Sequence, residues 1–212
     1  AAGYEQLRAE QAARRAAGDP VQLGIGVSVY VEITGGAGDE YGSVVVHPDG
    51  SATISAGTSA HGQGHATSFA MVASDRLGIP VEKIRFVQSD TATVPRGGGT
   101  GGSRSLQMAG NAVQAAADDV LEQGRKRAAA MLEASVDDVQ LTEDGEFGVA
   151  GVPSATVTWA QVASGAEAEG EQIFAGLDFH QDGATFPFGA HVSVVEVDTE
   201  TDRVTPLRHV AV

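Results

Sequence analysis

The chain has 212 residues, of which 42% are hydrophobic and 5% aromatic, and its formal net charge at pH 7 is −15. This length suffices for one large domain or two small ones. So large an acidic excess repels phosphate backbones and anionic lipid surfaces, which excludes nucleic acid as an expected partner. The absence of cysteine excludes disulfides and thiolate-ligated metal clusters within the chain. Its longest apolar stretches are far shorter than a membrane span.

The pattern of apolar residues predicts an α+β fold. Three-to-four spacing of apolar residues, with glycine or proline at the ends, indicates helices at residues 4–17, 66–77, 105–134 and 158–163. Runs rich in β-branched residues, or alternating in polarity, indicate strands at residues 23–33, 41–47, 51–56, 84–88, 139–141, 146–149, 190–198 and 203–212. Turn residues at 48–50 and 198–202 predict two hairpins. We expect mixed β-sheets packed with one long and one shorter helix.

Two further features concern the second half of the chain. Residues 165–170 are acidic and contain two glycines, which predicts a surface loop. The alternating pattern of residues 203–212 breaks off without a cap or a turn. From this break we expect the chain to be a piece of a longer polypeptide.

The first glycine-rich segment is Gly57-Thr-Ser-Ala-His-Gly-Gln-Gly-His65, which lies between a predicted strand and a predicted helix. Successive glycines let the backbone approach a ligand closely, and a helix N-terminus presents unpaired N–H groups with a partial positive charge. Gln63 adds an amide that both donates and accepts hydrogen bonds. The segment therefore suits a phosphate or a polar heterocycle. A plain strand-to-helix turn is the alternative interpretation.

The second glycine-rich segment is Asp90-Thr-Ala-Thr-Val-Pro-Arg-Gly-Gly-Gly-Thr-Gly-Gly-Ser-Arg-Ser105, which precedes the predicted long helix. In an otherwise acidic chain it brings together two arginines, several hydroxyls and bare backbone N–H groups. That combination suits a pyrophosphate or a dinucleotide. The alternative is a flexible loop in which Ser103 or Ser105 caps the helix.

A nicotinamide-binding motif is not a satisfactory interpretation of the second segment. Gly97, Gly99 and Gly102 match G-x-G-x-x-G literally. The motif should follow a strand directly and open a helix, whereas residues 91–96 intervene here. The chain also lacks the lysine motif of phosphate-binding loops and the serine motif of hydrolases.

His61 and His65 have the spacing of two zinc ligands on one face of a helix. Gly62 and Gly64 lie between them, so His61 should still be in the loop. No glutamate occupies the position of a metalloprotease base. We therefore predict hydrogen-bonding or surface histidines and assign no protein ligand to a metal.

Several motifs together resemble the large subunit of molybdenum hydroxylases, the family of xanthine dehydrogenase, aldehyde oxidase and carbon monoxide dehydrogenase. In order, they are the first glycine-rich segment, Arg76-Leu-Gly-Ile-Pro80, Ser89-Asp-Thr and Val94-Pro-Arg-Gly-Gly-Gly-Thr-Gly-Gly-Ser-Arg-Ser105. Val31-Glu-Ile-Thr-Gly-Gly36 and Phe188-Gly-Ala-His-Val-Ser-Val-Val-Glu-Val-Asp198 extend the resemblance over nearly the whole chain. The residues of the second glycine-rich segment and of Tyr30-Val-Glu-Ile33 look closest to those of the carbon monoxide dehydrogenase-like branch.

The resemblance implies molybdopterin as the cofactor, usually the cytosine dinucleotide in bacterial members, with molybdenum held by its dithiolene sulfurs. The family's cofactor-binding positions match His61, Gly62, Gln63, Gly64, Thr100, Gly102, Ser103, Arg104 and Ser105. Val29 and Tyr30 match part of the substrate pocket wall. Residues 1–134 would form a first molybdopterin-binding subdomain with both glycine-rich loops, and residues 135–212 the start of a second, truncated one.

The resemblance also sets what the chain should do. The catalytic residue stays unknown, because the family's catalytic glutamate is expected beyond Val212. The chain should bind part of the cofactor and be inactive alone. The intact subunit should be cytoplasmic and oxidise carbon monoxide, an aldehyde or a heterocycle with water as the oxygen source. Electrons should leave through FAD-binding and iron–sulfur partner subunits.

Two alternatives remain open. One is a structural paralogue that keeps the fold and has lost the cofactor. The other is a glycine-loop protein that binds nucleotides for regulation. The set of Gln63, Thr100, Ser103 and Ser105 argues against a paralogue without cofactor, because such a domain need not keep polar side chains there.

Overall fold

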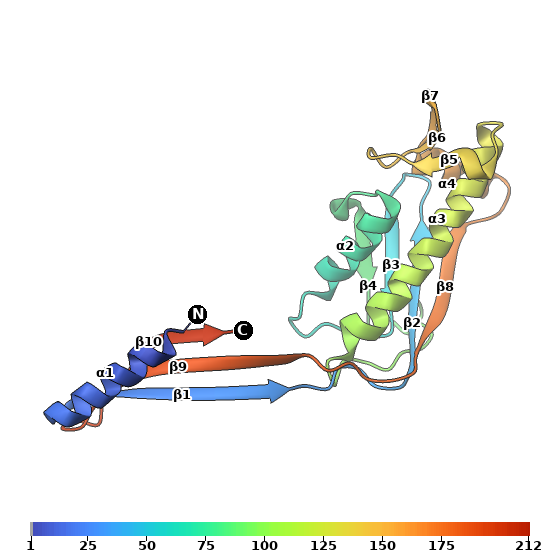
Figure 1. The fold of residues 1–212 in the computed structure, drawn as a ribbon. Coiled ribbons are helices and arrows are strands. Elements are labelled where there is room, and N and C mark those ends of the chain that lie inside the picture. The colour runs from blue at the N-terminus through green and yellow to red at the C-terminus, as the bar shows by residue number, and fades with distance from the viewer. Residues whose placement is uncertain (1) are drawn as a thin grey trace. The chain divides into compact units, whose positions relative to one another are not determined.

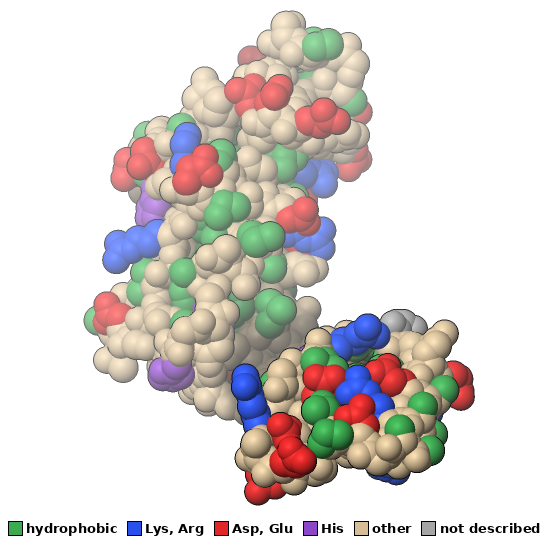
Figure 2. Space-filling model, turned by 90° about the vertical axis from the view of Figure 1, so that its left-hand side faces the viewer, with side chains coloured by type: hydrophobic (Ala, Val, Ile, Leu, Met, Phe, Trp, Pro, Cys, Tyr) green, Lys and Arg blue, Asp and Glu red, His purple; other side chains and the backbone are tan. Residues whose placement is uncertain are grey.

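The computed structural model describes residues 2–212, which fall into two compact units. The terminal unit holds the residues up to Ile33 together with Phe186–Val212, and the central unit is Thr34–Thr185. All helices within the described residues are too short or too polar to cross a membrane. The space-filling view shows acidic side chains in several separate groups, with basic side chains among them, so the acidic excess forms no single patch on this face (Figure 2).

The terminal unit is a three-stranded antiparallel sheet with one helix. Its strands lie in the order β1 (Val21–Val31), β9 (Phe188–Asp198) and β10 (Val204–Ala211). Helix α1 (Tyr4–Ala17) packs against β1 (Figure 1). Gln11 Nε2 of the helix donates to the Leu23 carbonyl oxygen at 2.8 Å, and Arg14 forms an ion pair with Glu196 of β9. The hairpin expected around residues 198–202 is thus present.

The central unit is built on a mixed four-stranded sheet in the order β4 (Ile84–Val87), β3 (Ala52–Ala56), β2 (Gly38–Val46) and β8 (Ile173–Gln181). Strands β3 and β4 are parallel and the other neighbours are antiparallel, so the hairpin expected around residues 48–50 is present. Helices α2 (His65–Leu77) and α3 (Asn111–Met131) pack on this sheet and on each other (Figure 1).

Small residues let α3 lie close to the sheet. A Cβ atom added at Gly42 of β2 would come within 2.7 Å of the Ala112 backbone. The buried face of α3 consists largely of alanine and valine, which explains how a chain with few aromatics fills its core. Core volume is therefore supplied by close backbone approach as well as by large side chains.

A small antiparallel sheet adjoins the C-terminal half of α3. Its strands are β5 (Val139–Leu141), β6 (Phe147–Val149) and β7 (Val152–Val157), and α4 (Trp159–Ala168) follows. Thr158 and Gln161 form a capping box at the start of α4. Two short 3₁₀ helices, η1 (Val81–Lys83) and η3 (Val136–Asp138), lead into β4 and β5.

The structure corrects four details of the expected elements. The surface loop predicted at residues 165–170 is wrong for residues 165–168, because Ala163 and Ala166 bury one face of a helix that continues to Ala168. The patterns did not predict β7 and β8. The long helix ends at Met131 and opens with a π-helical turn, η2 (Ser105–Gly110). The expected division at residue 134 falls inside the central unit, because β8 returns to pair with β2.

Candidate functional site

The two glycine-rich segments meet in the central unit. The first connects β3 to α2, and the second connects β4 to η2. A Cβ atom added at Gly57 would lie 2.2 Å from Gly97 Cα, and the Gly99 amide donates to the Gly57 carbonyl oxygen at 3.2 Å. Only glycine allows backbones to come this close. At these positions the glycines therefore serve contact between the two segments.

A network of hydroxyl groups joins the segments beside this contact. Thr58 Oγ1 lies 2.6 Å from Thr100 Oγ1 and 2.7 Å from Ser105 Oγ, and Thr100 Oγ1 also accepts the Ser59 amide at 3.1 Å. Thr58 is fully buried and Ser105 is nearly so. Sequence reasoning selected Thr100 and Ser105 but missed Thr58, whose place after a buried strand could have suggested a role.

A cleft of about 410 Å³ opens over this network, lined by His61, Gln63, His65, Thr100, Gly101, Ser103, Ser105 and Leu106. It contains five of the nine residues predicted to bind a cofactor. His65 was not among those nine. The π-helical turn η2 supplies Ser105 and Leu106, and such turns are frequent at functional sites.

Several of the predicted residues have backbone conformations that shape the cleft. Gly62, Gly64 and Gly102 have positive φ angles of 107°, 80° and 55°, which favour glycine. Ser103 has a φ of 53°, a left-handed conformation that is uncommon for serine. The Gln63 side-chain oxygen accepts the His61 backbone amide, and the residue lines the cleft.

The two arginines of the second segment correct the expectation of a positively charged site. Arg104 forms an ion pair with Glu40, with Nη2 and Oε2 3.2 Å apart, and its Nη2 also donates to the Asp39 carbonyl oxygen. Arg96 binds the Asp178 carboxylate through two nitrogens and lies over the Tyr41 ring. Carboxylates thus neutralise both guanidinium groups, because the surrounding strands supply them.

Glu40 is a second residue beneath the glycine-rich segments that sequence reasoning missed. It is 1% exposed, and the Gly98 amide donates to both of its oxygens at 3.2 Å. A Cβ atom at Gly57 would come within 2.3 Å of its Oε1. Glu40 therefore holds the second segment against the first from beneath. Glu40 lies just before the strand predicted at residues 41–47, so the sequence pattern did not indicate its burial.

The chemistry of the cleft is thus neutral and polar. Its lining offers hydroxyls, one amide and two imidazoles, and contains no lysine, arginine or carboxylate. His65 carries a buried Nδ1 without a hydrogen-bond partner. An orphaned buried nitrogen beside such a donor set fits a ligand rich in hydrogen-bonding atoms, as a pterin with its phosphate is.

The histidines do not assemble a metal site. His61 lies in the loop and is exposed, whereas His65 is the first residue of α2 and is buried. Across residues 2–212, no three histidine, aspartate or glutamate side chains come together as metal ligands would.

Val29 and Tyr30 lie in the terminal unit, on β1. They are adjacent in a strand and so point to opposite faces of the sheet, opposite Ala190 and Gly189 of β9. Both border a largely apolar hollow of about 350 Å³ at the end of the strands. Val29 is 78% exposed.

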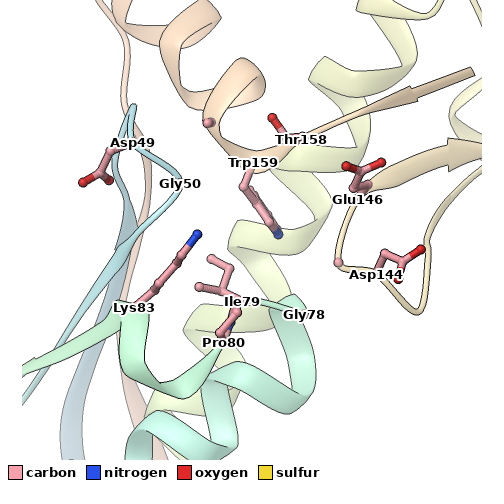
Figure 3. Close-up of a pocket in the computed structure, with 12 residues that line it drawn as sticks. Asp49, Gly50, Gly78, Ile79, Pro80, Lys83, Asp144, Glu146, Thr158 and Trp159 are labelled. Carbon is pink, nitrogen blue, oxygen red and sulfur yellow. The ribbon is translucent and has the colours of Figure 1, made fainter.

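A second cleft of the central unit has a volume of about 310 Å³ (Figure 3). None of the residues predicted to bind the cofactor or the substrate lines it. Lys83 points into it from one side, and Asp144 and Glu146 lie on the other. A Cβ atom added at Gly145 would lie 2.3 Å from the Gly78 carbonyl oxygen. The cleft thus lies where several connections pack tightly together.

Comparison with known proteins identifies the family of the chain. A family model described as "Molybdopterin cofactor-binding domain" matches residues 1–212. The chain is 37% identical to the carbon monoxide dehydrogenase large chain of Hydrogenophaga pseudoflava, over 95% of this chain and 27% of that one. It is 36% identical to the nicotine 6-hydroxylase large subunit of Paenarthrobacter nicotinovorans, over 92% of this chain and 26% of that subunit.

Solved structures show the same fold. Reconstituted carbon monoxide dehydrogenase from Oligotropha carboxidovorans superposes with a TM-score of 0.89 and 32% identity, over 99% of this chain and 28% of that chain. The chain thus spans little more than a quarter of the proteins it matches. It belongs to the molybdopterin cofactor-binding domain family, and it corresponds to part of the large subunit of a molybdenum hydroxylase similar to carbon monoxide dehydrogenase.

Proposed function

We propose that the cleft between the two glycine-rich segments holds part of molybdopterin, in the form of its cytosine dinucleotide. The observation that carries this proposal is the shared network of Thr58, Thr100 and Ser105, which joins both segments directly beneath a neutral polar cleft. A purely structural turn would need neither the network nor the open cleft above it.

Most of the predicted residues have a part in holding the cofactor. Gln63 offers its NH₂ group, and Ser103 and Thr100 offer hydroxyls from the opposite segment. Gly62, Gly64 and Gly102 allow the backbone turns that bring N–H groups to the ligand. Arg104 acts through Glu40, as a positioning residue for the loop. When bound, the cofactor supplies molybdenum and the redox chemistry.

The intact subunit would oxidise a small substrate with water as the oxygen source. The names of the relatives support carbon monoxide and nitrogen heterocycles as candidates, and aldehydes remain a third class. Val29 and Tyr30 would form part of the substrate pocket wall. FAD-binding and iron–sulfur partner subunits would carry electrons away, in the cytoplasm. The present chain alone would bind part of the cofactor without turning over.

The test is the molybdenum and pterin content of the intact subunit purified with its partners. We expect both in the wild type and a clear loss in Gln63→Ala and in the double variant Ser103→Ala/Ser105→Ala. Ser164→Ala is the control, because that hydroxyl bonds the Pro48 carbonyl oxygen, away from the cleft lining. A wild-type subunit with neither molybdenum nor pterin would favour the cofactor-free structural paralogue.

A further inference from the structure

His65 is the most enclosed polar side chain that faces the cleft. It is the first residue of α2, is 6% exposed and lines the cleft together with Thr100 and Ser105. Its Nδ1 is buried and has no hydrogen-bond partner within the chain. An unsatisfied buried nitrogen destabilises the fold, so its presence calls for an explanation.

Packing does not explain a histidine at this position. The His65 ring lies 5.3 Å from the Phe69 ring, and Phe69 in turn packs edge-on against Phe86 at 5.2 Å. These neighbours are apolar aromatic rings, so phenylalanine or leucine would satisfy the same contacts without leaving a nitrogen unpaired. The imidazole therefore has a use that an apolar ring could not fulfil.

The imidazole is uncharged at neutral pH. Burial lowers the pKa of His65, and the neighbouring His61 lowers it further. A neutral imidazole carries one N–H donor and one acceptor nitrogen. The cleft lining holds no charged group of fixed sign, so recognition there depends on hydrogen bonds. A neutral donor and acceptor pair matches a heterocycle such as a pterin, which presents both kinds of atom.

We propose that His65 is a further cofactor-binding residue, which hydrogen-bonds molybdopterin through its neutral imidazole from the floor of the cleft. The inference rests on the proposed function and adds a residue that was not among the nine predicted to bind the cofactor. It carries a consequence that a structural role does not: removing the imidazole should weaken cofactor binding while leaving the empty protein as stable as before, or more so.

Two variants of the intact subunit test this. His65→Phe keeps an aromatic ring against Phe69 and removes both nitrogens, whereas His65→Gln keeps a donor and an acceptor. The measurements are pterin and molybdenum per subunit, the rate of pterin release in urea below the unfolding transition, and the Tm of the pterin-stripped protein. His209→Phe is the matched control, since His209 is exposed in the terminal unit.

We expect His65→Phe to release pterin about tenfold faster, as loss of one hydrogen bond would do, with an unchanged or higher Tm when stripped. His65→Gln should restore most of the retention, and His209→Phe should behave as the wild type. Two results for His65→Phe would overturn this inference alone: pterin release at the wild-type rate, or a Tm of the stripped variant below that of the stripped wild type. Failure of His65→Gln to restore pterin retention would also overturn it. A wild-type subunit without pterin would overturn the proposed function and this inference with it.

Discussion

Glu40 and Arg104 form an ion pair in which the carboxylate is almost completely buried, with 3.2 Å between Oε2 and Nη2. The same carboxylate accepts the Gly98 amide, and Arg104 lies directly beneath Gly98. A buried charge is tolerated only when it is paired and hydrogen-bonded. The pair therefore fixes the second glycine-rich segment from below and leaves the upper side of that segment free for a neutral cleft.

Glu40→Gln tests this pair. The substitution keeps the size of the side chain but leaves the partly buried Arg104 without its counter-charge, so we expect a loss of about 3 kcal/mol in the free energy of unfolding. Urea unfolding measures it. Glu32→Gln, at an exposed carboxylate, should change stability by less than about 0.5 kcal/mol. Equal stability of the two variants would show that the ion pair does not hold the segment.

The sequence predicted local structure better than long-range structure. Turn residues at 48–50 and 198–202 predicted two hairpins that the structure contains, because hairpin pairing is set by neighbouring residues. Strand β8 contains Gly176 and Asp178, and it exists because β2, over a hundred residues earlier, offers a free edge. Intrinsic preference could not reveal that pairing.

The candidate site shows the same difference between local features, which the sequence predicted, and long-range contacts, which it did not. The glycine-rich segments were visible in the sequence, but their meeting required the topology that places the ends of β3 and β4 side by side. The arginines looked like ligand-binding charges because their carboxylate partners, Glu40 and Asp178, lie 64 and 82 residues away. Charge neutralisation by distant residues is invisible to motif reading, and it changes the inferred chemistry of the cleft from cationic to neutral.

Thr58→Val should loosen the hydroxyl network. Valine has the same shape but neither donates nor accepts, so Ser105 keeps only its contact with Thr100 at 3.2 Å. Thr100 keeps that contact and its hydrogen bonds to the Ser59 backbone. We expect a loss of about 1–2 kcal/mol in stability and a lower pterin content in the intact subunit. Thr205→Val, in β10, is the control for the same substitution in the terminal unit. Unchanged pterin content would argue that the network only joins the two segments.

Gly57→Ala should disrupt the contact between the segments. Its Cβ would lie 2.2 Å from Gly97 Cα and 2.3 Å from the Glu40 carboxylate, so backbone would have to move. We expect a destabilisation of about 1–3 kcal/mol, measured by urea unfolding. Gly26→Ala in β1 is the matched control, because nothing lies within 4 Å of its added Cβ. If both variants unfold alike, the close approach of Gly57 and Gly97 does not contribute to stability.

The His180–Asp39 pair should make stability depend on pH. Asp39 accepts a hydrogen bond from His180 Nδ1 at 2.6 Å and raises the pKa of that histidine, and Asp182 adds to the effect. Because the folded pKa is raised, the contribution is fully present below the unfolded value of about 6.5 and disappears as the pH rises through the folded pKa. Wild type should therefore exceed Asp39→Asn in Tm at pH 5.5 by more than at pH 8.5. Both side chains are largely exposed, so the difference should shrink in high salt. An identical Tm difference at both pH values would mean that protonated His180 gains nothing from Asp39.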